Sequence, residues 1–86
     1  MYKISILKRA EKDIKKLDRS NKNRVVKAIM DLAEEPRPVG CRKILSEKGV
    51  WRIRVGDWRV GYTIDDNLLE VTIIRIANRG EFYNWK

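Results

Sequence analysis

Three arginines in one short segment are the side chains of this sequence best suited to chemistry. Arg52, Arg54 and Arg59 lie within Val50–Tyr62, where charged and apolar residues alternate as they do along a half-buried strand. Like charges facing each other destabilise a sheet, and no carboxylate on these two strands offsets them. A guanidinium fork matches the oxygens of a phosphate, so the cluster indicates a site for a phosphate or phosphodiester anion.

The turn between the two strands predicts how the arginines pair. Gly56 and Asp57 suit a two-residue turn of type II′, which takes glycine at its first position. Counting outward from that turn predicts the pairs Val55–Trp58, Arg54–Arg59, Ile53–Val60, Arg52–Gly61 and Trp51–Tyr62. The arginines then share one face with Gly61, which adds no bulk. The alternative is an ordinary solvated face, but three same-sign residues across one hairpin favour the anion site.

The C-terminal segment supplies a second set of functional residues. Arg79 and Tyr83 are four positions apart, so they share one side of a helical tail. The rings of Tyr83 and Trp85 can stack on a nucleic-acid base. Phe82 is expected to close the edge of the core instead, and for Trp85 both interpretations remain open.

The positive charge is concentrated in the middle of the chain. The 86 residues carry a formal net charge of +8. Residues 36–64 contribute seven basic and two acidic side chains, whereas residues 65–86 are slightly acidic. This balance favours a polyanionic partner, which can be RNA, DNA, a ribosome or an acidic protein. If the partner is RNA, we predict that Lys43, Lys48 and Trp85 bind it.

Composition excludes several classes of enzyme. The sequence has no histidine and a single cysteine, Cys41. A histidine-based acid–base pair, a Ser-His-Asp triad and a thiolate zinc site are therefore excluded, and we predict no metal and no cofactor. The length predicts one domain, residues 1–86, and no apolar run is long enough to cross a membrane. We expect a cytoplasmic protein in which Cys41 is a free, small apolar filler.

The elements that must position these residues form an α+β fold. Apolar spacing predicts a strand at Tyr2–Leu7, a helix at Lys8–Leu17, and a second helix with Ser20 as its N-cap that ends near Glu35 before Pro36. Residues 50–55, 58–64 and 68–76 read as three strands joined by short turns. We therefore predict an N-terminal strand and an antiparallel helix hairpin packed on a small antiparallel β-sheet meander.

Four segments together resemble the RelE/ParE toxin superfamily, and the likeness extends over the whole chain. They are Pro36–Gly40, Lys43–Leu45, Trp51–Tyr62 and Asn78–Tyr83, of which the hairpin segment is the most specific. The resemblance implies a RelE-like, microbial-ribonuclease-type fold and a toxin of a type II toxin–antitoxin system. The RelE branch cleaves mRNA in the ribosomal A site, whereas the ParE branch inhibits DNA gyrase and lacks the basic catalytic set.

By resemblance, the catalytic residues are Arg52, Arg54, Arg59, Arg79 and Tyr83, and their presence favours a metal-independent endoribonuclease that inhibits translation. Arg59 and Arg79 hold the phosphate, and Tyr83 is the best candidate base. Known RelE-branch members carry lysines at the positions of Arg52 and Arg54. Arginine does not release its proton, so either Arg54 acts only through its charge or water transfers the proton. A ParE-like gyrase inhibitor without nuclease activity is the alternative.

The resemblance also implies the partners of the protein. The expected ones are a cognate acidic antitoxin, mRNA on the ribosome and ribosomal RNA, with no membrane contact. A small antitoxin whose acidic, partly disordered segment wraps the basic surface would make a toxin–antitoxin hetero-oligomer.

Overall fold

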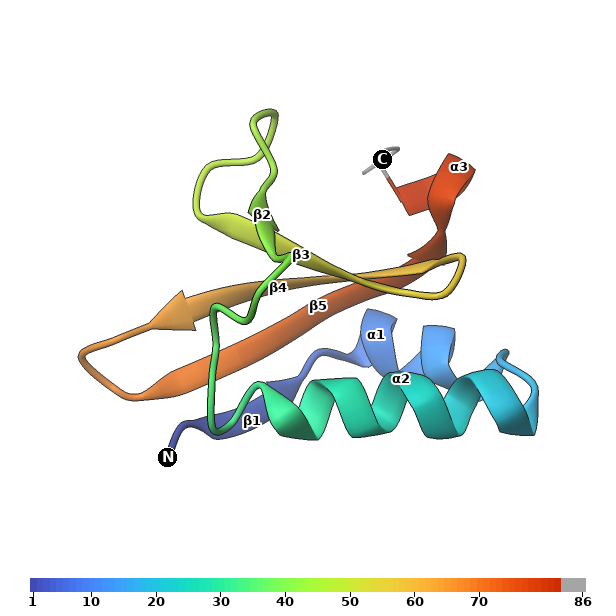
Figure 1. Cartoon of the computed structure of the whole chain (residues 1–86), viewed down its shortest axis with the longest axis horizontal. Helices are drawn as coiled ribbons and strands as arrows, with labels where there is room; N and C mark the ends of the chain where they lie inside the picture. Colours follow the sequence, from blue (N-terminus) through green and yellow to red (C-terminus); the bar gives the residue numbers. More distant parts are fainter. Residues whose placement is uncertain (83–86) are drawn as a thin grey trace.

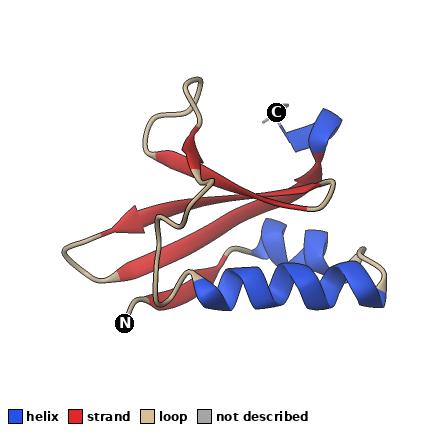
Figure 2. Cartoon of the chain, viewed as in Figure 1, coloured by secondary structure: helices blue, strands red, loops and turns tan. Residues whose placement is uncertain are grey.

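A five-stranded mixed sheet forms the centre of the molecule, with its strands in the order β1-β5-β4-β3-β2. The computed structural model describes residues 1–82. Along the chain the elements are β1 (Lys3–Ile6), α1 (Lys8–Lys15), α2 (Arg19–Asp31), β2 (Arg42–Lys43), β3 (Val50–Val55), β4 (Trp58–Asp65), β5 (Glu70–Asn78) and α3 (Arg79–Phe82). Helices α1 and α2 lie on one side of the sheet, and the β2–β3 turn and α3 rise on the other (Figures 1 and 2).

The predicted helix hairpin is present, but its second helix begins earlier than expected. Asp18, and not Ser20, is the N-cap of α2, because its side chain accepts a hydrogen bond from the backbone N–H of Asn21 at 2.9 Å. Both residue types cap helices, and the carboxylate that comes first in the chain takes the role. The helix ends at Asp31, and tight turns then carry the chain to Glu35 and Pro36.

The predicted meander is confirmed, including its register. Strands β3 and β4 pair through all five predicted partners, from Val55–Trp58 to Trp51–Tyr62. Gly56 has a φ of 61°, whereas Asp57 is not among the residues with positive φ. This is the pattern of the predicted type II′ turn, in which only the first central residue needs positive φ.

Both edges of the sheet differ from a simple meander. Strand β1 pairs with β5 in parallel, so the N-terminal strand belongs to the sheet itself. At the other edge, the two residues of β2 pair antiparallel with β3. A two-residue strand has no periodicity, which explains why the sequence pattern did not reveal it.

The main hydrophobic core lies between the helices and the sheet. Its fully buried members include Val25 and Ile29 of α2 with Val60, Tyr62 and Ile73 of the sheet. Six apolar side chains of the hairpin join it: Ile53, Val60 and Tyr62 are buried, and Trp51, Val55 and Trp58 are partly buried. Among the described residues, no helix is long and apolar enough to span a membrane.

A β-bulge changes the alternation of β5. Tyr62 pairs with Ile73 and Gly61 pairs with Arg75, so Ile74 is the extra residue. A bulge places two residues of one strand opposite one residue of the other. Beyond it, a second and smaller core on the far side of the sheet joins Ile44, Val50, Ala77 and Phe82, with Ile74 packed against them. Phe82 is fully buried there, which confirms its predicted role in the core.

Candidate phosphate-binding face

The predicted arginine cluster lies on the face of the sheet that α1 and α2 leave uncovered. Residues paired across neighbouring strands share a face, so the register defines two adjacent rows. One row runs across four strands as Arg42, Arg52, Gly61 and Arg75. The next contains Arg54, Arg59 and Ala77. Neither row holds a carboxylate, so the register assigns five arginines and no acidic residue to this side of the sheet, which we call the arginine face.

Arg59 is the most deeply buried charge of the arginine face, with a relative exposure of 4%. Its Nε and Nη1 atoms are buried and have no hydrogen-bond partner within the described part of the chain. Burying a charge without a partner costs several kcal/mol in real proteins. Anionic oxygens that accept hydrogen bonds from these nitrogen atoms would offset this cost, and phosphate oxygens form strong charge-assisted bonds of this kind.

The other hairpin residues predicted to act on RNA occupy different surroundings. Arg52 is half-buried beside Gly61, and Arg54 is exposed where β3 extends beyond β2. Arg54 also lines a mostly apolar pocket of about 350 Å³ between α2 and the segment 38–40. Lys43 pairs with Trp51, and its Nζ lies 5.3 Å from the centre of the Trp51 ring, which places it on the helix side of the sheet. Lys48 is exposed in the β2–β3 turn.

The end of β5 carries the chain to the remaining site residues. Beyond the end of β1, the Ile76 backbone N–H donates to Oδ2 of Asp13 in α1 at 2.9 Å, so α1 supports the strand where β1 no longer does. Asn78 Oδ1 then accepts the backbone N–H of Glu81 at 3.0 Å at the start of α3. Arg79 is exposed at the first position of α3. Tyr83 and Trp85 lie outside the described residues.

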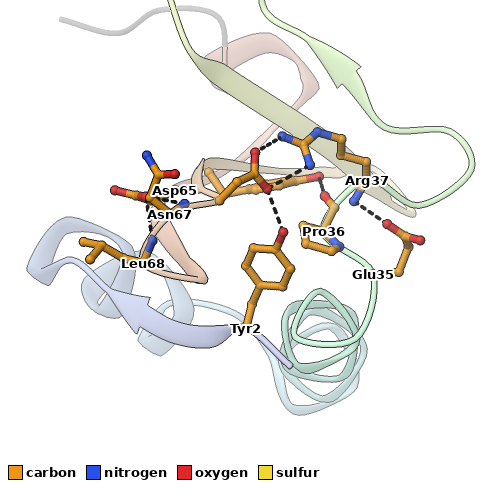
Figure 3. A network of polar contacts seen from close by, with 9 residues as sticks. Tyr2, Glu35, Pro36, Arg37, Asp65, Asn67 and Leu68 are labelled. Atoms are coloured by element: carbon orange, nitrogen blue, oxygen red, sulfur yellow. Dashed lines mark hydrogen bonds and ion pairs between the residues drawn. The ribbon is translucent and has the colours of Figure 1, made fainter.

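Arg37, also in the basic middle of the chain, is held in a polar network away from the arginine face (Figure 3). Its guanidinium bonds both carboxylate oxygens of Asp66, the shorter distance being 2.9 Å. The Tyr2 hydroxyl donates to the same carboxylate at 2.6 Å, and the Arg37 guanidinium lies 5.3 Å from the Trp51 ring centre. The network fastens the segment after α2 to the β4–β5 turn.

Neither tyrosine in residues 1–82 is suited to act as a base. Tyr62 is fully buried and donates to the Pro36 carbonyl at 2.7 Å, and burial raises its pKa above the ordinary value. The pKa of Tyr2 is also raised, mainly because its hydroxyl donates to the Asp66 carboxylate. A tyrosine base would need a lowered pKa, so Tyr83 keeps this role as a prediction.

Two members of the arginine face were not predicted from the sequence. Arg75 reaches this face because the bulge at Ile74 shifts the alternation of β5, and Arg42 reaches it through the short strand β2. An alternation argument without a bulge has no means of placing Arg75. In residues 1–82, no group of three or more Cys, Asp or Glu side chains is arranged to hold a metal ion.

The overall architecture is that of RelE toxins. The RelBE2 toxin–antitoxin complex from Mycobacterium tuberculosis matches at a TM-score of 0.79 and 28% identity, over 91% of this chain and 98% of the other. The RelE–RelB complex from Pyrococcus horikoshii matches at a TM-score of 0.80 and 25% identity, over 92% and 96%. The isolated RelE toxin of E. coli shares the fold at a TM-score of 0.78, with 23% identity over 98% and 93%.

A match to a family model shows the family to which this chain belongs. The model described as the ParE toxin of type II toxin–antitoxin systems, parDE, matches residues 4–83. The chain therefore belongs to this toxin family, within the RelE/ParE superfamily that its sequence resembles. No curated protein sequence is similar enough to the chain to count as a match.

Proposed function

We propose that this toxin is a ribosome-dependent endoribonuclease that cleaves mRNA in the A site, in the cytoplasm, and so inhibits translation. One observation supports the proposal most strongly: the buried Arg59 guanidinium has two N–H groups without a hydrogen-bond partner in residues 1–82. A cation kept in this state is costly to the fold. Its benefit lies in binding an anion, and the scissile phosphate is the anion that the RelE-like fold and the neighbouring arginines favour.

The proposed reaction draws its nucleophile from the RNA. The 2′-hydroxyl attacks the adjacent phosphorus, the P–O5′ bond breaks, and the products are a 2′,3′-cyclic phosphate and a free 5′-hydroxyl. Arg59 and Arg79 hold the phosphate in line for attack. Arg52 and Arg54 stabilise the charge that develops on the phosphorane and on the leaving oxygen.

The arginines cannot transfer protons, so the mechanism needs other groups for this step. Tyr83 is the proposed base that takes the 2′-hydroxyl proton, a role that requires guanidinium charge near its hydroxyl to favour the phenolate. Arginine keeps its proton at any working pH. We therefore assign Arg54 an electrostatic role, and water delivers the proton to the 5′-oxygen.

We propose a cognate acidic antitoxin as the partner that silences the toxin. The matched M. tuberculosis and P. horikoshii structures are complexes of a RelE-type toxin with its antitoxin. The five arginines of the arginine face, within a chain of net charge +8, are complementary to an acidic segment. A hetero-oligomer that covers this face would keep RNA from it.

The proposal is tested with purified toxin, mRNA and programmed ribosomes. Arg59→Met keeps the unbranched apolar part of the side chain but removes the guanidinium, and we expect cleavage to fall by about 10²–10³-fold. Tyr83→Phe is expected to have a comparable effect. The matched control is Arg19→Met, because Arg19 is an exposed arginine at the first position of α2. Undiminished cleavage by Arg59→Met would contradict the proposed role of the arginine face.

A gyrase inhibitor is the second candidate function, because the matching family model is that of ParE toxins. The same preparation is therefore tested for inhibition of DNA supercoiling by gyrase. Loss of supercoiling together with intact mRNA on ribosomes would replace the nuclease by this alternative.

A further inference from the structure

We propose that a polar cavity beside the end of β5 binds a guanine base of the RNA, with Glu81 as the residue that recognises it. This inference rests on the proposed function, because it concerns the base next to the phosphate that Arg59 is proposed to hold. It gives a role in sequence preference to a carboxylate that the proposed mechanism does not use.

The cavity lies where β5 extends beyond its pairing with β1, and its volume is about 270 Å³. Helix α1 lies on one side of the sheet there and α3 on the other (Figure 1). The lining is mostly polar and includes both basic and acidic side chains. The residues on which the inference depends are Arg9, Asp13, Lys16, Trp58, Ala77 and Glu81.

The position of the cavity relative to Arg59 suits a base of the bound strand. Ala77, which lines the cavity, is the strand partner of Arg59. Neighbouring strands lie about 4.8 Å apart, so the cavity begins one strand away from Arg59. A nucleotide whose phosphate lies at Arg59 is therefore close enough for its base to enter the cavity. Trp58 is half-buried and also lines it, and aromatic side chains stack on bases in RNA sites.

Glu81 is the carboxylate of the cavity that is available to a ligand. Asp13 is already used by the fold, because its Oδ2 accepts the Ile76 N–H at 2.9 Å and its Oδ1 lies 3.6 Å from Nε of Arg9. Arg75 lines the cavity too, but it already has an interaction partner, so we assign it no part in binding. Glu81 is exposed, and within residues 1–82 its side chain forms no ion pair.

Guanine is the base whose hydrogen-bonding pattern matches this cavity. An ionised carboxylate only accepts hydrogen bonds. Guanine alone among the four bases presents two neighbouring donors, N1–H and the N2 amino group, on its pairing edge. In adenine, cytosine and uracil the donor stands beside an acceptor, which a carboxylate repels. The O6 atom next to N1 is an acceptor, and the cationic side chains of Arg9 and Lys16 at the same cavity can donate to it.

The test compares three uncleavable 2′-O-methyl dinucleotides, GpG, IpI and ApA. Inosine lacks only the N2 amino group of guanosine. Affinities for the free toxin are measured by NMR titration at low salt. We expect GpG to bind about tenfold more tightly than IpI, as one bidentate contact predicts, and ApA to bind no more tightly than IpI. Glu81→Gln should remove most of this preference, because an amide offers a single acceptor oxygen.

The ratio of the two affinities separates recognition from charge. Glu81→Gln also removes a negative charge, which strengthens the binding of every RNA by a similar factor and leaves the ratio of GpG to IpI unchanged. The matched control is Glu11→Gln, because Glu11 is an exposed carboxylate of α1 outside the cavity. This variant should keep the tenfold ratio. The proposal is overturned if GpG does not bind, if it binds no more tightly than IpI, or if the preference survives Glu81→Gln.

This binding measurement is independent of ribosomes and of cleavage. If ribosome-dependent cleavage is absent but the affinity ratio depends on Glu81, the guanine site stands and the proposed function fails. If the toxin cleaves mRNA but the ratio does not depend on Glu81, the proposed function stands and the guanine site fails.

Discussion

Tyr62 and Arg59 lie three residues apart on β4, and both are buried. Their polar groups differ in hydrogen bonding and face opposite sides of the sheet. Tyr62 faces the helices, and its hydroxyl donates to the Pro36 carbonyl at 2.7 Å. Arg59 faces the other side, where two of its N–H groups are buried without a hydrogen-bond partner in the described residues. Every buried polar group costs stability unless it is paired. The helix side is therefore built for stability, whereas the arginine face carries a buried charge that costs stability, and we propose that this charge serves the binding of an anion.

The same difference extends over the two sides of the sheet. Within residues 1–82, the helix side holds the main core, while the apolar cluster on the arginine face is the small one around Phe82 and Ile44. Arg37, by contrast, forms an ion pair with Asp66, in which Nη2 lies 2.9 Å from Oδ2 although both side chains are partly exposed to solvent. The unpaired state of Arg59 is thus specific to its face of the sheet.

The largest expected effect on stability comes from Ile73, which is compared with its neighbour, the bulge residue Ile74, in the other core. Ile73 is fully buried in the main core, and Ile74 is half-buried in the small one. We expect Ile73→Ala to lower the free energy of unfolding by about 2–5 kcal/mol. Ile74→Ala should lower it by about half as much, because part of its surface already meets solvent. Urea unfolding measures both, and equal losses would mean that the two sides do not differ as described.

A smaller loss is expected where only a hydroxyl is removed from the helix side. Tyr62→Phe leaves the Pro36 carbonyl without its donor, and we expect a cost of about 1–3 kcal/mol. Tyr2→Phe is the matched control, because its hydroxyl also donates but is exposed to water. Its loss should be clearly smaller, and a loss as large as that of Tyr62→Phe would contradict the importance of burial.

The smallest effect is expected from Asp66, which is exposed, and it depends on pH. The Arg37 guanidinium, and next the Tyr2 hydroxyl, hold the pKa of the Asp66 carboxyl below its ordinary value. Asp66 therefore contributes stability fully above its unfolded pKa of about 3.9, and this is lost as pH falls through the lowered folded pKa. Melting temperatures of the native protein and Asp66→Asn should differ at pH 7 and converge in strong acid. A gap that persists there would rule out this linkage.

Local rules predicted the hairpin, because a two-residue turn and strict alternation determine its register. The same rules failed at two places for physical reasons. Asp18 and Ser20 are both good N-caps, so the start of α2 depends on how the chain leaves α1. Ile74 is the extra residue of a bulge and Arg75 follows it; the position of the bulge depends on pairing with β4, and the periodicity of β5 does not reveal it. The sequence thus predicted Arg52, Arg54 and Arg59 on one face, but not the row that Arg75 completes.

The central claim is that the buried charge of Arg59 is kept for binding and not for stability. The most direct test is the free energy of unfolding of Arg59→Met against the native protein in a buffer free of phosphate and sulfate. We expect the methionine variant to be more stable by about 1–4 kcal/mol, because it keeps an apolar side chain at this position and removes the buried charge. Added phosphate should narrow the gap by stabilising the native protein. A methionine variant that is less stable than the native protein would contradict the claim.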